Sequence, residues 1–234
     1  MSLLGLSSLI WVAGSALAGP QTQTGPPRPS IVPKSWQLDL ELDQPRRIYL
    51  RLPGQSTPQL YWYLLYRVTN NTGRDRLFFP IVEVIYPTPD GIGRVQADMG
   101  INPAVFQAIK RRHAKTHPFL IEPVLAIGRL LQGQDNAKTS VAIWPAIDPR
   151  ADRFSLFIAG LSGQTARVPN PNYDPSRPEV EPRRLPDGTV LPMRLNPRVF
   201  TLRKVLRIDY DLPGDPVTRA TVRPVQRARQ WIMR

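Results

Sequence analysis

Residues 60–69 read LYWYLLYRVT and are apolar on both faces of an extended chain. Such a run is typical of a strand buried in the middle of a sheet. The turn-forming residues 70–73 (NNTG) follow. Residues 77–86 (LFFPIVEVIY) then have the composition of a second core strand, in which Pro80 marks an edge or a bulge. We therefore expect these two stretches to pair as a hairpin at the centre of the fold.

On the N-terminal side, residues 36–42 and 47–52 alternate apolar with polar side chains, which predicts two half-buried strands. If these strands pair with each other, the acidic face of the first lies across from the basic face of the second. Further strand candidates occur along the rest of the chain at 119–127, 139–144, 154–159, 199–212 and 230–233.

One helix is predicted, over residues 103–115, with Asn102 as its N-cap and Pro103 at its first position. Many short strands and a single helix indicate an all-β fold. We expect an immunoglobulin-like β-sandwich with one short helix and a long Pro-rich loop insertion at 167–197. Within that insertion, Asp187 and Gly188 are typical of a small hairpin turn.

The composition excludes several kinds of chemistry. The chain has 234 residues with 27 Pro, no Cys and 2 His. Without Cys there are no disulfides, thiol nucleophiles, Cys-based zinc sites or iron–sulfur clusters. The pair His113 and His117 has a spacing compatible with metal binding, but Pro118 ends the helix there and no Glu lies between them. We expect no catalytic residues, no metal site and no cofactor.

The N-terminus has the pattern of a secretory signal peptide. Residues 3–18 are uncharged and apolar and end in Ala-Leu-Ala, although no Lys or Arg precedes them. An uncleaved anchor and a buried structural segment are the alternatives. We expect a signal peptide at 1–18, a Pro-rich disordered lead-in at 19–33 and a single β-sandwich domain at 34–234. The mature protein would have no transmembrane span and would be located in the periplasm, the cell envelope or outside the cell.

The net charge of +13 is concentrated partly in the C-terminal tail. Four arginines there are candidates for binding an anionic partner: Arg219, Arg223, Arg227 and Arg229. The alternative is a solvated edge strand whose charges prevent aggregation. Exposed aromatic residues such as Tyr61, Tyr63 and Tyr173 would add stacking surface.

These observations favour an exported, non-catalytic protein of the cell envelope that binds an anionic envelope polymer or another envelope protein. One alternative is a hydrolase of envelope polymers that uses carboxylates such as Asp148, Asp152 or Glu83. Another is a basic nucleic-acid-binding protein, which requires that the chain is not exported. The sequence leaves the ligand and the oligomeric state open.

Four segments resemble a group of uncharacterised exported proteins of planctomycete-type bacteria. These segments are residues 63–73, 141–163, 206–215 and 231–234. Each corresponds to a strand with its turn, and none is a catalytic signature. The resemblance implies an exported β-rich domain and implies no activity, ligand or site residue.

Overall fold

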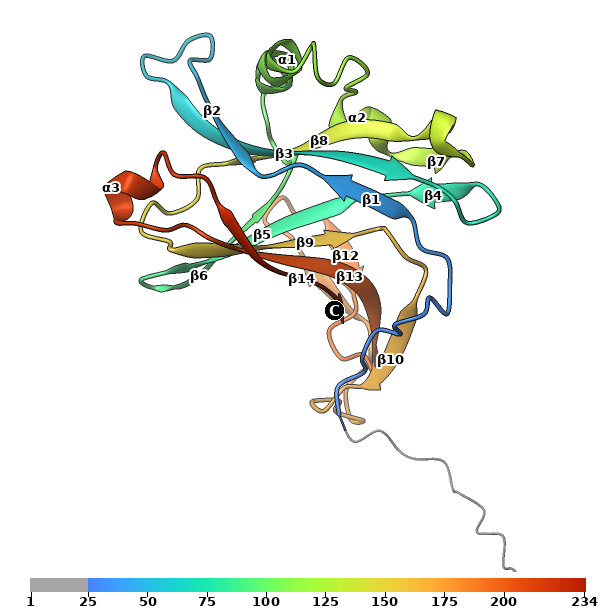
Figure 1. Ribbon diagram of the computed structural model, residues 1–234. Coiled ribbons are helices and arrows are strands. Elements are labelled where there is room, and N and C mark those ends of the chain that lie inside the picture. The colour runs from blue at the N-terminus through green and yellow to red at the C-terminus, as the bar shows by residue number, and fades with distance from the viewer. Residues whose placement is uncertain (1–24) are drawn as a thin grey trace, which may run out of the picture.

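The computed structural model describes residues 25–234. The predicted signal peptide and the first residues of the predicted lead-in, 19–24, lie outside this range. The described chain is built mainly from antiparallel strands, which confirms the all-β prediction at that level (Figure 1). No helix within residues 25–234 is both long enough and apolar enough to cross a membrane.

A four-stranded sheet is organised around one long central strand. It consists of β1 (Asp39–Leu42), β2 (Arg46–Leu50), β3 (Gln59–Thr69) and β8 (Lys138–Pro145). β8 pairs with one edge of β3 along most of its length. β1 and β2 follow one another along β3, with Leu42 opposite Tyr66 and Arg46 opposite Tyr63. The first two predicted strands therefore pair with β3 and not with each other.

A six-stranded sheet forms the second layer. It consists of β5 (Ile81–Thr88), β6 (Gly91–Gln96), β9 (Arg153–Ala159), β10 (Thr165–Pro169), β13 (Val199–Asp211) and β14 (Val225–Met233). β13 pairs with β10 through its first half, and with β9 and β14 through its second half. The strands predicted at 139–144, 154–159, 199–212 and 230–233 are all confirmed.

The predicted central hairpin is wrong. The stretch 77–86 is divided between β4 (Arg76–Phe78), which pairs with β7 (Gly128–Leu130), and β5 in the six-stranded sheet. The break falls at Phe79 and Pro80, where proline has no N–H to continue a ladder. At this point the chain crosses from the layer of the four-stranded sheet to the six-stranded sheet, so β3 and β5 lie in different layers.

The predicted helix forms as α1 (Pro103–Arg112), and Asn102 Oδ1 accepts a hydrogen bond from Ala104 N at 2.9 Å. It buries Val105, Phe106 and Ile109 against the outer face of the four-stranded sheet. Three further short helical segments are α2 (Pro123–Ala126), η1 (Gln134–Asn136) and α3 (Pro216–Arg219).

The strand expected at 119–127 is wrong. The segment forms only an isolated bridge, from Leu120 to Thr139, and then enters α2. Pro123 explains the difference, because its fixed φ and missing N–H suit the first turn of a helix and not a paired strand.

The core has two layers because β3 is buried on both of its faces. Trp62, Leu64 and Tyr66 face the six-stranded sheet, where the ring of Trp62 lies 5.6 Å from that of Phe154. Tyr63 and Leu65 face α1 on the opposite side. Figure 1 shows this order of layers, with α1 above the four-stranded sheet and the six-stranded sheet below it.

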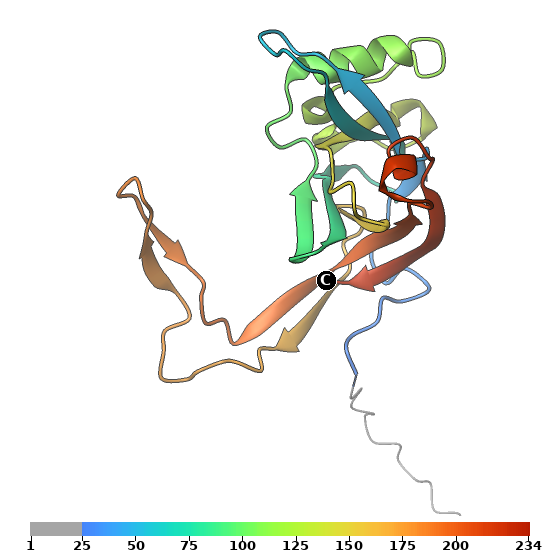
Figure 2. The ribbon, with the colours of Figure 1, turned by 90° about the vertical axis from the view of Figure 1, so that its left-hand side faces the viewer.

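The segment predicted as a Pro-rich loop contains an ordered hairpin, β11 (Glu181–Arg184) and β12 (Val190–Met193). Its turn is the predicted one: Gly188 has φ 86°, and Asp187 Oδ1 accepts a hydrogen bond from Thr189 N. Figure 2 shows that this hairpin stands apart from the two sheets, at the end of the ribbon formed by β10 and β13.

The described part of the lead-in lies against the sheet. The Ser30 hydroxyl donates to Gln164 Oε1 at 2.9 Å, and Lys204 Nζ donates to the Ser30 carbonyl at 3.2 Å. Lys204 is only 2 % exposed, and its ammonium lies 4.9 Å from the ring centre of Trp231. Burial lowers the pKa of Lys204, and the carbonyl and the ring face are the groups that offset the loss of water.

Gly160 allows a close approach between the backbones of two chain segments. It has φ +88°, and a Cβ at this position would lie 2.3 Å from the Phe79 carbonyl oxygen. The crossover at Phe79 and Pro80 therefore depends on a residue without a side chain at the end of β9.

We expect Gly160→Ala to lower the free energy of unfolding by about 3 kcal/mol or more, because it adds a backbone clash to the cost of positive φ. Gly54→Ala is the matched control, since Gly54 has φ +80° but open space around it. Its cost should be only about 1–2 kcal/mol. Urea unfolding of both variants measures the difference, and equal costs would show that the contact with Phe79 is unimportant.

Asp98, which follows β6 of the six-stranded sheet, contacts β8 of the four-stranded sheet and so joins the two sheets. Its N–H donates to the Ile143 carbonyl at 2.7 Å, and its Oδ1 accepts from Ile143 N at 2.9 Å, so it pairs with the free edge of β8. Part of the residue stays exposed, but burial of the carboxyl group raises its pKa to about 7. The carboxyl therefore binds its proton more tightly in the folded chain than in the unfolded chain.

Deprotonation of Asp98 should lower the free energy of unfolding as the pH rises from about 4 to 7. We expect Asp98→Asn, which keeps the Oδ1 acceptor, to be more stable than the natural protein at pH 8 and to lose this advantage at pH 4. His113, whose pKa is lowered by burial, acts in the opposite direction but is present in both proteins. Urea midpoints across this range provide the measurement, and a constant difference between the two proteins would contradict the assignment.

Candidate anion-binding site

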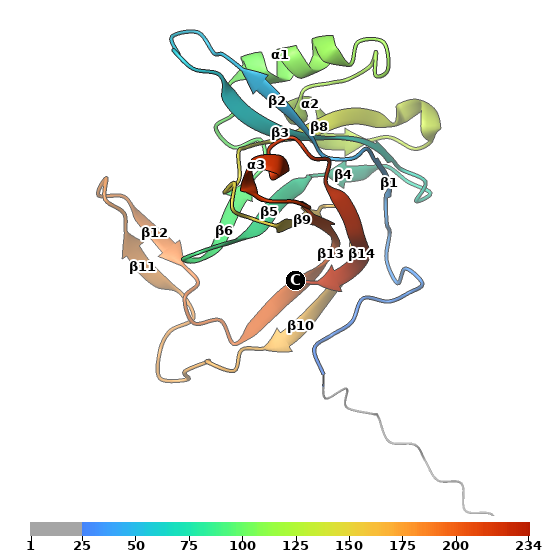
Figure 3. The same ribbon diagram turned by 60° about the vertical axis from the view of Figure 1, so that its left-hand side comes forward.

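A groove of about 570 Å³ lies where three separate segments of the chain meet. The start of β2 forms one wall, the C-terminal end of α1 another, and the link between α3 and β14 the third. Figure 3 shows the positions of β2, α1 and α3 in the fold. Four arginines line this groove: Arg46, Arg47, Arg112 and Arg223. Asp43 is the only carboxylate among its lining residues, so the groove is strongly basic.

Arg47 holds the groove together. It donates from Nη1 to the Val222 carbonyl at 2.5 Å and from Nη2 to the Arg219 carbonyl at 2.6 Å, while its guanidinium lies 3.9 Å from the ring centre of Trp62. Burial lowers the pKa of Arg47, although an arginine stays protonated at neutral pH. Its side chain thus fastens the α3–β14 link to the four-stranded sheet.

The other arginines present their charge to solvent. Arg112 Nη1 donates to the Arg47 carbonyl at 3.1 Å, which leaves its remaining N–H groups for a ligand. Arg46 forms an exposed ion pair with Asp43 at 3.2 Å. Arg223 is exposed and forms no ion pair with any carboxylate of residues 25–234. Tyr49, which is 60 % exposed, adds an aromatic surface at the rim.

The four arginines predicted in the tail do not form one patch. Arg223 lies in the groove, and Arg219 lies next to it but donates from Nη1 to the Arg150 carbonyl. Arg227 forms an ion pair with Asp211 on the outer face of the six-stranded sheet. Arg229 reaches instead to the Leu40 carbonyl of β1 at 3.1 Å.

Sequence reasoning missed three of the groove's arginines. Arg47 lies on the basic face of a predicted strand, Arg46 lies in the turn before it, and Arg112 lies at the C-terminal end of a helix, where the helix dipole already favours a positive charge. Each of these signals is local, and only the packing of β2 against α1 and the α3–β14 link brings them together with Arg223.

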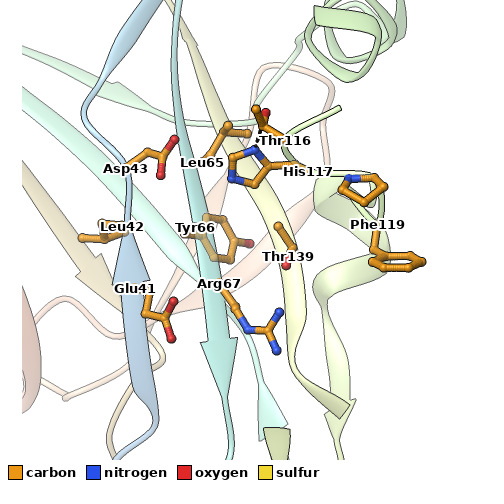
Figure 4. Close-up of a pocket in the computed structure, with 11 residues that line it drawn as sticks. Glu41, Leu42, Asp43, Leu65, Tyr66, Arg67, Thr116, His117, Phe119 and Thr139 are labelled. Carbon is orange, nitrogen blue, oxygen red and sulfur yellow. Dashed lines mark hydrogen bonds between the residues drawn. The ribbon is translucent and has the colours of Figure 1, made fainter. Parts of the chain in front are cut away.

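A second groove of about 370 Å³ begins on the other side of Asp43 (Figure 4). His117, Glu41 and Arg67 also line it. Residues 25–234 contain no group of three or more His, Asp and Glu side chains placed to bind a metal ion. The positive charge of Arg67 partly offsets the two carboxylates, Glu41 and Asp43, so this groove carries less net charge than its neighbour.

His113 is a buried part of the core. It is 3 % exposed, and its Nε2 lies 3.0 Å from the Tyr63 hydroxyl while its Nδ1 lies 3.3 Å from Thr116 Oγ1. Burial, and then the positive charge of Arg46, lowers the pKa of His113, so this imidazole is neutral at pH 7. Tyr63 is fully buried and Tyr61 is 7 % exposed, so the expectation that these two aromatics lie on the surface is wrong. Tyr173 is half-buried.

The carboxylates considered for hydrolysis are held by arginines. Asp148 forms an ion pair with Arg150 at 2.7 Å, and its hydrogen bonds to Arg150 lower its pKa to about 2. Glu83 forms ion pairs with Arg94 at 2.9 Å and with Arg234 at 2.5 Å. Asp148, with its pKa lowered in this way, is ionised at neutral pH and does not donate a proton there, as a general acid must.

We compared the chain with protein-family models, with curated proteins and with solved structures, and none of them matches it. The arrangement of the groove itself is therefore the basis for its interpretation.

We expect Arg47→Gln to lower the free energy of unfolding by about 2 kcal/mol, because two carbonyls lose a charged donor. The exchange of amide hydrogens in residues 216–224 should accelerate as this link is released. Arg46→Gln is the matched control with the same change of charge, and its exposed ion pair should contribute no more than about 0.5 kcal/mol. Equal effects of the two substitutions would show that Arg47 does not hold the groove together.

Proposed function

We propose that this protein is an exported, non-catalytic binding module of the cell envelope, built on an immunoglobulin-like β-sandwich. Its arginine-lined groove would bind an anionic partner, either an acidic envelope polymer or an acidic segment of another envelope protein. The observation that carries the proposal is the convergence of Arg46, Arg47, Arg112 and Arg223 on one groove that has a single carboxylate.

The chemistry of the groove favours carboxylate, sulfate or phosphate groups. Guanidinium groups donate pairs of parallel hydrogen bonds to such anions, and these charge-assisted bonds are among the stronger ones in water. Arg112 and Arg223 are exposed and keep donors available, whereas Arg47 is already satisfied. The ligand would therefore bind across Arg112 and Arg223, with Arg46 beside them.

The long-range field supports the same partner. The net charge of +13 attracts polyanions from a distance and accelerates their association at low salt. The apolar N-terminal run and the resemblance to exported β-rich proteins support an envelope partner over nucleic acid. Because Asp148 and Glu83 are paired with arginines, the carboxylate-dependent hydrolase has less support than binding.

The double variant Arg112→Gln/Arg223→Gln should bind a carboxylated polysaccharide such as polygalacturonate about tenfold more weakly at low salt, because two charge-assisted contacts are lost. Its affinity should also depend less steeply on salt, with the slope reduced by about one or two. Isothermal titration or surface plasmon resonance provides both values.

Arg167→Gln/Arg203→Gln is the matched control, since it removes the same charge from exposed positions on the distant β10–β13 ribbon. If both double variants weaken binding equally, the net charge and not the groove is responsible, and the proposed site is wrong. If single-stranded RNA binds much more tightly than the polysaccharide at the same salt concentration, the basic nucleic-acid-binding alternative replaces the proposed function.

A further inference from the structure

The β11–β12 hairpin is an ordered arm without a core of its own. Asn196 is 4 % exposed and organises its base, with Nδ2 donating to the carbonyls of Asp174 and Arg177 and Oδ1 accepting from Asp174 N. The hairpin strands pair only with each other within residues 25–234. Since an isolated two-stranded hairpin is marginally stable in water, this arm is built to be completed by a further contact.

One face of the arm is apolar and carries one charge. The register places Arg184 opposite Val190 and Pro182 opposite Pro192, so these four side chains share a face. All four are exposed, Val190 to 51 %. Arg184 forms no ion pair with a carboxylate in the described part of the chain, whereas Arg177 and Arg194 pair with Glu181 and Glu179. This face therefore offers aliphatic surface around an available guanidinium.

The body of the protein has a groove with the complementary character. This groove has a volume of about 380 Å³ and lies between β5, α1 and α2. Its only charged lining residues are Asp98 and Glu122, in a protein whose net charge is +13. The apolar side chains in and around it are exposed to unusual degrees: Ile81 46 %, Met99 66 %, Val124 65 %, Leu125 61 % and Ile127 45 %. Exposed apolar surface of this extent marks an interaction site.

The arm of the same copy does not cover this groove. Figures 2 and 3 show the hairpin held apart from the body, on the side where β6 lies. A second copy supplies the same arm and the same groove, so two copies related by a two-fold axis satisfy both contacts at once and form a closed dimer. Each arm would then gain the packing that it lacks in the single chain.

We propose that two copies of this chain exchange arms, so that the Arg184–Val190 face of each β11–β12 hairpin covers the apolar groove of the other copy and Arg184 pairs with Glu122. This dimer is independent of the anion-binding groove, which lies on β2, α1 and the α3–β14 link. Because both copies are strongly basic, apolar burial drives the association, and moderate salt strengthens it by screening the net charge.

The absence of Cys from the chain allows a direct test by cross-linking. We expect an equal mixture of the single variants Val190→Cys and Val124→Cys to form a disulfide-linked heterodimer on mild oxidation. Val217→Cys is the matched control, because Val217 is 84 % exposed on α3, outside both surfaces. A mixture of Val190→Cys with Val217→Cys should stay largely uncross-linked.

Charge reversal tests the proposed ion pair. In sedimentation experiments at moderate salt, Arg184→Glu should weaken the dimer about tenfold or more, and the double variant Arg184→Glu/Glu122→Lys should recover most of that loss. Both substitutions lie at the surface and should leave the fold intact, which circular dichroism verifies.

Three results would overturn the proposal. One is a natural protein that remains monomeric at about 200 µM in moderate salt, well above the concentration at which a specific dimer forms. Another is cross-linking of Val190→Cys to the control position as efficiently as to Val124→Cys. The third is an intramolecular disulfide in the double variant Val190→Cys/Val124→Cys without any dimer, which would show that the arm closes on its own body.

Discussion

β3 is buried on both faces, and the rest of the molecule is arranged around this constraint. A strand that is apolar on both sides needs a packed layer above it and another below. The six-stranded sheet covers one face through Trp62, Leu64 and Tyr66, and α1 covers the other through Tyr63 and Leu65. Because α1 has to lie over β3, its C-terminal end comes beside β2, and this proximity forms one wall of the basic groove.

The second wall depends on Arg47. Its guanidinium binds two backbone carbonyls of the α3–β14 link and stacks on Trp62, whose ring belongs to the central core. The core and the groove are thus connected by one side chain. The same residue accepts a hydrogen bond from Arg112 through its carbonyl, so the three segments are joined at one point. In this arrangement Arg47 is a structural cation, while Arg112 and Arg223 present their charge to solvent.

Most individual strands were predictable, but their partners were not. The alternation in β13 and the apolar character of β8 and β9 define strands from local pattern alone, because side chains alternate between the two faces. The predicted hairpin of 60–69 with 77–86 is wrong. Turn residues between two apolar runs predict pairing. In the structure, however, Pro80 interrupts the second run, and the chain crosses to the other sheet where Gly160 lies close to Phe79. The helix at α1 was predictable from Asn102 and Pro103, and α2 was missed because its apolar residues match either period.

The sequence by itself determined the class of the fold, the α1 helix, the turn at Gly188 and the strongly basic charge, since each depends on residues close together in the chain. It also identified the tail arginines as candidates. Only the tertiary structure decided that Arg223 joins Arg46, Arg47 and Arg112, while Arg227 and Arg229 are used elsewhere. The reason is physical: arginines distant in the chain meet only where the core packing brings their segments together, and that packing is a property of the whole fold.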